Sequence, residues 1–205
     1  MIGEWLQNLD SWLFSLLNGW HCSLLDPVME AFSSRTWLIA LLLVIFILVI
    51  WQGGKQRRLA LLMLLITLGV SDYVSSSIVK KSVKRSRPCN QIGAVHYLDN
   101  NLGWVMTPAE VGRSWKSSYS FPSSHAANGM AVALWLGFLF KRGRLWWLLL
   151  AFGIGYSRIY LGVHYPTDIL GGFLLGGLLA WLAIYFYDRY GPAAAPAKGP
   201  SEGTE

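Results

Sequence analysis

Five apolar stretches, each of a length that suits a helix, constrain the fold of this chain more than any other feature. They cover about residues 36–52, 59–79, 123–140, 145–156 and 167–187. Because a helix of roughly 20 apolar residues crosses a bilayer, we interpret the five stretches as transmembrane spans. The composition agrees, since 54% of the residues are hydrophobic and only 14% are charged. The sequence therefore predicts an all-α fold, a polytopic bundle of five transmembrane helices.

The region before the first span is apolar at helical spacing but is interrupted by polar residues such as Asp10 and Asn18. We therefore expect amphipathic helices in the membrane interface; a first transmembrane helix, which would make a sixth span, is the alternative. After the last span, the chain is rich in proline, alanine and glycine without periodicity, which indicates disorder. The predicted organisation is an N-terminal region (1–35), a membrane domain (36–187) and a disordered tail (188–205).

Two short basic turns, residues 52–58 and 141–144, indicate the orientation of the chain. Both lie on the same side of the bilayer if five spans are present, and the positive-inside rule makes that side cytoplasmic. The long polar loop of residues 80–121 then faces outward, although it holds more cations than either turn. We interpret this excess as a site for phosphate. The cations of the loop are Lys80, Lys81, Lys84, Arg85, Arg87, Arg113 and Lys116.

Net charge and cysteine content limit the partners of the chain. The formal net charge of +6 favours anionic partners, either lipid head groups or phosphates. Nucleic acid is a poor fit, because no soluble module with interleaved basic and aromatic residues is present. Cys22 and Cys89 are too few for a disulfide framework and lack the spacing of metal ligands; we expect free thiols, with one disulfide as the alternative. Gly172 and Gly176 form a GxxxG step, which predicts close helix packing.

Three polar blocks could carry chemistry, and the first follows the second span. If that helix continues past Val79, then Lys80, Lys84 and Arg87 recur at i, i+4 and i+7 and form a ladder of cations on one helix face. Pro88 would end the helix near Arg87. Such a ladder suits a phosphate and its lipid linkage; the alternative is that these cations only contact lipid head groups.

The second block opens the third span. Ser123 and Ser124 precede a helix and are expected as N-caps, and the free backbone N–H groups of a helix start can bind an anion. His125 lies in the first turn, from which its side chain would point toward that anion. A purely structural histidine is the alternative.

The third block joins the fourth and fifth spans. Arg158 ends one apolar stretch, and Pro166 suits the first turn of the next helix. His164 and Asp168 would then lie one turn apart on one helix face, where the carboxylate can hold the imidazole in one tautomer. The alternative is a capping histidine and an arginine that extends to the membrane surface.

Together the blocks resemble the type 2 phosphatidic acid phosphatase (PAP2) family of membrane phosphatases. The family pattern is Lys, six residues, Arg-Pro; then Pro-Ser-Gly-His; then Ser-Arg, five residues, His, three residues, Asp. The first and third blocks, residues 80–88 and 157–168, match in full. The second block, residues 122–125, differs only at Ser124, where the family usually has glycine. The resemblance covers about residues 36–187.

The resemblance implies a role for each matching residue. His164 would attack phosphorus to give a phosphohistidine, with Asp168 orienting it, and His125 would serve as general acid and then as general base. No metal or other cofactor is implied. The implied phosphate-binding residues are Lys80, Arg87, Ser123, Ser124 and Arg158, with Lys84 as a further contact to the head group.

The resemblance also implies the function, hydrolysis of a phosphate monoester or diphosphate on a lipid head group. Candidate substrates are undecaprenyl diphosphate, phosphatidylglycerophosphate, phosphatidate and lipid A 1-phosphate. The short chain resembles bacterial members, which implies the cytoplasmic (inner) membrane with the site facing the periplasm. A lipid phosphotransferase with the same intermediate is the alternative. An anion transporter fits less well, because no internal repeat is visible and the charges gather at one face.

The loop of residues 89–119 is expected to shape the choice of head group through Trp104, Arg113 and Trp115. The alternative is that its tryptophans only anchor the chain in the membrane interface.

Overall fold

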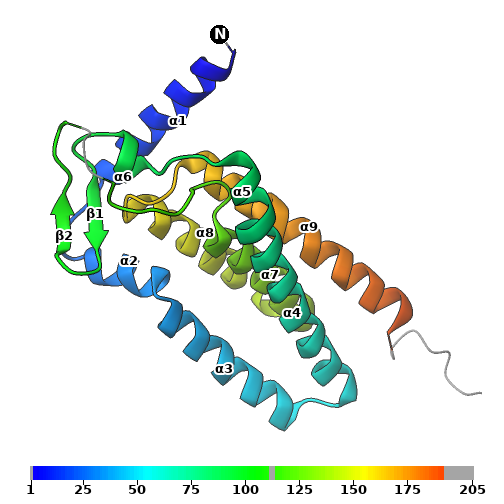
Figure 1. Ribbon diagram of the computed structural model, residues 1–205. Helices are drawn as coiled ribbons and strands as arrows, with labels where there is room; N and C mark the ends of the chain where they lie inside the picture. The colour runs from blue at the N-terminus through cyan, green and yellow to red at the C-terminus, as the bar shows by residue number, and fades with distance from the viewer. Residues whose placement is uncertain (1, 111–113, 192–205) are drawn as a thin grey trace, which may run out of the picture.

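The structure is a computed structural model, and it describes residues 2–110 and 114–191. Figure 1 shows a bundle of long helices with a small β-hairpin at one end. The central helix is α7, which packs against α4, α8 and α9. The long helices are α3 (Arg35–Gln52), α4 (Lys55–Tyr73), α7 (Ser124–Leu139), α8 (Arg144–Tyr160) and α9 (Pro166–Tyr190).

The five predicted spans correspond to these five helices, but not all of them are long enough to cross a membrane alone. In the described part of the chain, residues 55–91 and α9 satisfy the length and hydropathy of a span. Helices α2 (Asp26–Ser33) and α3 form a third candidate if the pair, bent by 63°, is counted as one span. Helices α7 and α8 have only 16 and 17 residues. The structure thus supports a mostly helical membrane protein with two or three candidate spans.

Helix α4 does not stop at its formal end. It continues through a π-helical turn (Val74–Val79) into the short α5 (Lys80–Val83), and after a gap α6 (Pro88–Gln91) follows. π-helical turns are rare and concentrate at functional sites. Here the turn lies directly before the first polar block.

Small residues allow α7 and α9 to pack closely, as the GxxxG step predicts. A Cβ atom on Gly172 would lie 2.5 Å from the carbonyl oxygen of Ser123, and one on Gly176 would collide with the carbonyl of Ala127. Any larger side chain would push the start of α9 away from the start of α7. This packing therefore sets the distance between the second and third polar blocks.

The N-terminal helix α1 (Ile2–Gly19) has a polar face that is turned inward. It exposes Trp5 and Trp12 but buries Asp10 and Asn18, which are 2% and 4% exposed. The Asn18 amide donates to three backbone carbonyl oxygens, two of them at the end of α8. An apolar outer face with a satisfied polar inner face suits a helix that lies at a membrane surface.

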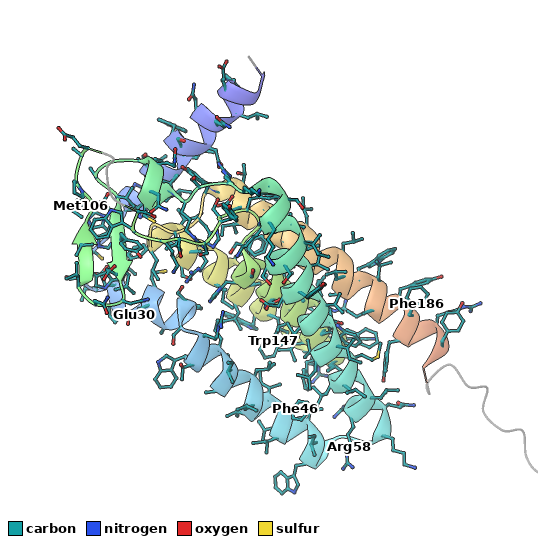
Figure 2. All side chains as sticks on the ribbon, viewed as in Figure 1. Glu30, Phe46, Arg58, Met106, Trp147 and Phe186 are labelled. Carbon is teal, nitrogen blue, oxygen red and sulfur yellow. The ribbon has the colours of Figure 1, made fainter. Side chains whose placement is uncertain are left out.

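The all-α prediction missed one element, an antiparallel hairpin of β1 (His96–Asp99) and β2 (Gly103–Met106). The Asp99 carboxylate accepts from the backbone N–H groups of Asn101 and Leu102, and Gly103 takes a positive φ of 71°. The four-residue strands are too short to leave a clear alternation in the sequence. Met106 in the hairpin and Arg58 in the first turn of α4 lie at opposite ends of the bundle (Figure 2).

The structure also bears on the predictions for the two cysteines and for the end of the last span. Cys22 is exposed and Cys89 is buried, and both are free thiols. Helix α9 extends to Tyr190, a little beyond the predicted end of the last span. The rest of the predicted tail, residues 192–205, and Arg113 lie outside the described residues.

Candidate active site

The three polar blocks meet at the hairpin end of the bundle. The first lies after α4, the second at the start of α7, and the third between α8 and α9. The Ser123 N–H donates to the backbone carbonyl of Asp168 at 3.0 Å, which ties the second block to the third. Residues up to 88 positions apart in the sequence thus form one polar cluster.

His164 lies at the centre of this cluster and is 2% exposed. Its Nδ1 faces Asp168 Oδ2 at 3.4 Å, and its Nε2 lies 3.2 Å from Nη1 of Arg87. The prediction that His164 and Asp168 share a helix face is wrong in detail, because α9 begins at Pro166 and His164 lies in the preceding turn. The turn still brings the two side chains together.

The charge state of His164 follows from its surroundings. Burial, followed by the nearby cations Arg87, Arg158 and Lys80, lowers the pKa of the imidazole well below its usual value. The ring is therefore neutral at physiological pH. With the Nδ1 proton directed to the Asp168 carboxylate, the unprotonated Nε2 faces the Arg87 guanidinium. A neutral imidazole of this tautomer is a competent nucleophile.

Asp168 is fully buried, and its two carboxylate oxygens have different partners. Oδ2 accepts from the backbone N–H of Tyr165 at 2.9 Å and faces His164. Oδ1 accepts from the guanidinium of Arg85 at 2.8 Å. The sequence identifies Arg85 only as one of the loop cations, since this residue lies outside the family pattern. Its spacing to Arg87 carries no sign of this contact.

Arg87 is 4% exposed and connects the first block to the loop before α7. Its guanidinium donates to the carbonyl oxygens of Ser118, Tyr119 and Val163 and to the Ser118 hydroxyl, at 2.8 to 3.1 Å. All of these acceptors are uncharged. The positive charge of Arg87 is therefore fixed in place beside His164 without being paired there.

Lys80 and Ser124 contact each other across the cluster. Lys80 Nζ donates to Ser124 Oγ at 3.1 Å, and the Ser75 hydroxyl in the π-helical turn donates to the same oxygen at 2.9 Å. Ser123 is the N-cap of α7, as predicted, and accepts from the N–H of Ala126. At the position where the family has glycine, this chain thus uses a hydroxyl to hold a cation.

Arg158 and His125 are held by a residue that the sequence analysis missed. Arg158 donates to the Ser33 hydroxyl, and its Nε is buried without a partner in the described part of the chain. The backbone carbonyl of Ser33 accepts from His125. Ser33 lies at the bend between α2 and α3, so the N-terminal region contributes to the site. Consecutive serines at a break between two apolar helices were the only sequence signal.

The predicted ladder of cations is wrong at Lys84. Helix α5 ends at Val83, Lys84 is exposed with a positive φ of 53°, and Arg87 has an extended backbone. Helical spacing therefore does not apply after Val83. Lys80 and Arg87 approach the cluster from two different backbone segments, whereas Lys84 does not join them.

A cavity of about 300 Å³ opens beside the cluster between α3, α4, α7 and α8. Its polar end includes Ser124 and His125, and most of its remaining lining is apolar. A hydrocarbon chain could occupy this space while its head group meets the cations. The apolar lining includes Leu38, Leu42, Ile45, Leu68, Val132, Leu136, Leu150 and Ile154.

The cluster offers a neutral imidazole, a second histidine and several cations that act on the first, an arrangement suited to phosphoryl transfer. Within the described residues, no three His, Cys, Asp or Glu side chains are grouped so that they could hold a metal ion. The cations that act on the imidazole of His164 include Arg87, Arg158 and Lys80.

Comparison with known proteins gives a consistent result. The sequence profile of the PAP2 superfamily matches residues 59–192. The lipid A 4'-phosphatase of Bacteroides thetaiotaomicron is 30% identical over 186 residues, which cover 89% of this chain and 78% of that protein. The undecaprenyl-diphosphatase BcrC of Bacillus subtilis is 28% identical over 175 residues, covering 84% and 80%.

A solved structure shares the fold. The crystal structure of a transmembrane PAP2-type phosphatidylglycerolphosphate phosphatase from Bacillus subtilis superposes with a TM-score of 0.66 at 26% identity, covering 90% of this chain and 87% of that one. The polar blocks, their convergence and these similarities agree. The chain therefore belongs to the PAP2 superfamily, and it is a phosphoric monoester or diphosphate hydrolase of the lipid phosphatase type.

Proposed function

We propose that this protein removes phosphate from a lipid head group through a phosphohistidine on His164. The observation that carries the proposal is the double contact of its imidazole, with Nδ1 facing Asp168 and Nε2 beside Arg87. This leaves the nucleophilic nitrogen at the place where a cation can hold phosphate. A merely structural histidine would have no need of the buried cations around it.

In the first step, His164 Nε2 attacks phosphorus, a P–N bond forms, and the bond from phosphorus to the lipid oxygen breaks. His125 gives a proton to the departing oxygen. Lys80, Arg87 and Arg158 stabilise the charge that spreads over the phosphoryl oxygens. Asp168 stabilises the proton and positive charge on the imidazole.

In the second step, His125 takes a proton from a water molecule, whose oxygen attacks phosphorus. The P–N bond breaks, phosphate leaves, and both histidines return to their starting states. An acceptor other than water would give a phosphotransferase instead. The two reactions differ only in the second step.

The substrate is proposed to be a lipid displayed on the outer leaflet, because the polar cluster and the basic α3–α4 turn lie at opposite ends of the bundle (Figure 1). The positive-inside rule puts that turn in the cytoplasm and the site at the periplasmic face of a bacterial inner membrane. The apolar cavity beside Ser124 and His125 supports a lipid over a soluble phosphate ester. Similar proteins named for lipid A, undecaprenyl diphosphate and phosphatidylglycerolphosphate define the range to test.

Phosphate release by the purified protein in detergent tests this function. The panel is undecaprenyl diphosphate, phosphatidylglycerophosphate, phosphatidate and lipid A carrying the 1- or the 4'-phosphate. We expect release from at least one lipid and none from the His164→Asn variant, with Lys84→Ala as an active control. No release from any lipid, together with phosphate flux through proteoliposomes, would favour the transporter instead.

Trapping the intermediate tests the mechanism separately. A ³²P-labelled substrate should leave an acid-labile, alkali-stable label on the protein, as phosphohistidine does, and His164→Asn should lose it. His125→Gln should slow the second step and accumulate the label when the leaving group needs no proton. Direct hydrolysis by water predicts no label in any variant.

A further inference from the structure

Asp10 lies on the amphipathic helix α1, far in sequence from all three polar blocks, yet it reaches the same end of the bundle. Its Oδ2 accepts from Nη2 of Arg85 and from the Thr167 hydroxyl, both at 2.5 Å, and its Oδ1 accepts from the Thr167 N–H at 3.0 Å. Asp10 is 2% exposed. A buried carboxylate is costly unless it is paired, and here every contact leads toward the start of α9.

Arg85 completes the link to the catalytic pair. Nη1 donates to Asp168 Oδ1 at 2.8 Å and to the Thr167 hydroxyl at 2.7 Å, and the guanidinium lies 4.0 Å above the ring of Tyr165. Arg85 therefore bridges two buried carboxylates, one on α1 and one on α9. Its fork geometry fixes the direction of both bonds.

We propose that Asp10 and Arg85 are positioning residues, which hold the Asp168 carboxylate so that only Oδ2 is free to orient His164. The proposal rests on the proposed function of His164 as nucleophile. Without Arg85, Oδ1 would lose its cation, and the carboxylate could rotate about its own bond. Without the charge of Asp10, Arg85 would no longer be held from the side opposite Asp168. The surface helix α1 thereby becomes part of the catalytic apparatus.

A merely structural role is the competing explanation, since Asp10 also fastens α1 to the bundle. Asn18 supplies a matched control, because it is the second buried polar residue of α1 and bonds only to backbone groups of the hairpin and of α8. Asn18→Ala should loosen α1 without touching Asp168. Asp10→Asn should leave the Thr167 N–H bonded and remove mainly the charge.

The test combines steady-state kinetics with the pH profile of kcat/KM, measured on whichever lipid the panel identifies. Asp10→Asn and Arg85→Gln should each lower kcat about tenfold or more, with KM within about twofold, as displaced partners of a catalytic group do. Asp10→Glu should recover part of the loss. Asn18→Ala should lower the melting temperature and keep kcat.

The acidic side of the pH profile of kcat/KM distinguishes a positioning role of Asp10 and Arg85 from a merely structural one. His164 is faced by four groups besides Asp168, namely Lys80, Arg87, His125 and Arg158. Removing the Arg85 cation should raise the pKa of His164 and move this acidic side to higher pH, whereas removing the Asp10 anion should move it lower. Each shift should be about half a pH unit, the order expected for one partly screened charge. Loosened packing gives no such opposite pair.

The proposal is overturned if Asp10→Asn keeps the wild-type kcat and pH profile, or if Asn18→Ala loses as much kcat as Asp10→Asn. If Arg85→Gln does not fold, the near-isosteric Asp10→Asn decides alone. Failure of the proposed function would look different, since His164→Asn would then retain activity or the wild-type protein would carry no phosphohistidine.

Discussion

Arg85 and Arg87 stand two residues apart on the same loop, yet their surroundings differ in kind. Arg85 donates to the carboxylates of Asp10 and Asp168. Arg87 donates to backbone carbonyls and one hydroxyl and reaches the neutral His164. The charge of Arg85 is neutralised by two carboxylates of the protein, whereas the charge of Arg87 remains available to a ligand. Under the proposed function, this difference predicts that Arg87 binds phosphate and that Arg85 supports the site, a distinction that charge counting in the sequence cannot make.

Of the two arginines, Arg87 is expected to show the larger effect. Arg87→Gln should lower kcat/KM about 10² to 10³-fold, because one fixed charge at the phosphoryl oxygens is worth this much in comparable sites. Arg87→Lys should recover only part, since lysine cannot reproduce the forked contacts to Ser118 and Val163. Phosphate release from the best lipid of the panel measures both. If Arg87→Gln loses no more kcat/KM than Arg85→Gln, the proposed difference between the two arginines is wrong.

The pH profile is the next test. Burial and the neighbouring cations lower the pKa of His164, so kcat/KM should hold below pH 6.5 and decline only further into acid. His125 must be protonated for the first step, and the negative charge of a bound phosphate favours that proton, so a decline in alkali is expected in kcat, which reports the complex with substrate. Arg87→Gln should raise the pKa of His164 and move the acid limb up by about one pH unit. A steady rise from pH 5 to 9 would contradict these assignments.

The same lowered pKa has a consequence for stability. The unfolded chain binds a proton at His164 near pH 6.5, whereas the folded protein does not, so this group makes folding less favourable as pH falls below about 6.5. His164→Asn should therefore flatten the acid side of the melting temperature as a function of pH. An unchanged slope in detergent would show that other groups control it.

A smaller effect is expected at Ser33, whose hydroxyl accepts from Arg158. Ser33→Ala should lower kcat/KM by about tenfold, since it leaves a second donor of a buried guanidinium without a partner. Ser34→Ala is the matched control, because the Ser34 hydroxyl caps α3 and accepts from the Trp37 N–H. Equal losses in the two variants would point to the helix bend instead of the hydroxyl.

The smallest effects are expected at Lys84 and Ser124. Lys84 is exposed and outside the cluster, so Lys84→Ala should at most raise KM about twofold and leave kcat unchanged. Ser124→Gly restores the residue of the family pattern and frees Lys80 from its hydroxyl partner; kcat should stay within about threefold of the wild type. A collapse of kcat in Lys84→Ala would place that lysine back in the site.

The sequence predicts the features that depend on residues close together in the chain. Apolar runs indicated the five long helices, and fixed gaps within each block indicated His164, Asp168, Lys80 and Arg87. The ladder through Lys84 failed because a single left-handed residue ended the helix, and no local pattern marks that residue. Ser33 and Asp10 were not identified because their partners lie 75 to 157 residues away in the sequence. Contacts of that range follow from the packing of whole helices and leave no periodic trace.

The pairing of Asp10 with Thr167 has a consequence for biosynthesis. These residues are 157 positions apart, so the Asp10 carboxylate gains its full set of partners only after the start of α9 is in place, although Arg85 is present earlier. Asp168 directly follows Thr167, so the contact of its carboxylate with His164 also forms only at that stage. A chain that ends before residue 167 lacks Asp168 and should not hydrolyse lipid phosphates. An incompletely synthesised copy would then leave the lipids of the membrane unchanged during its insertion.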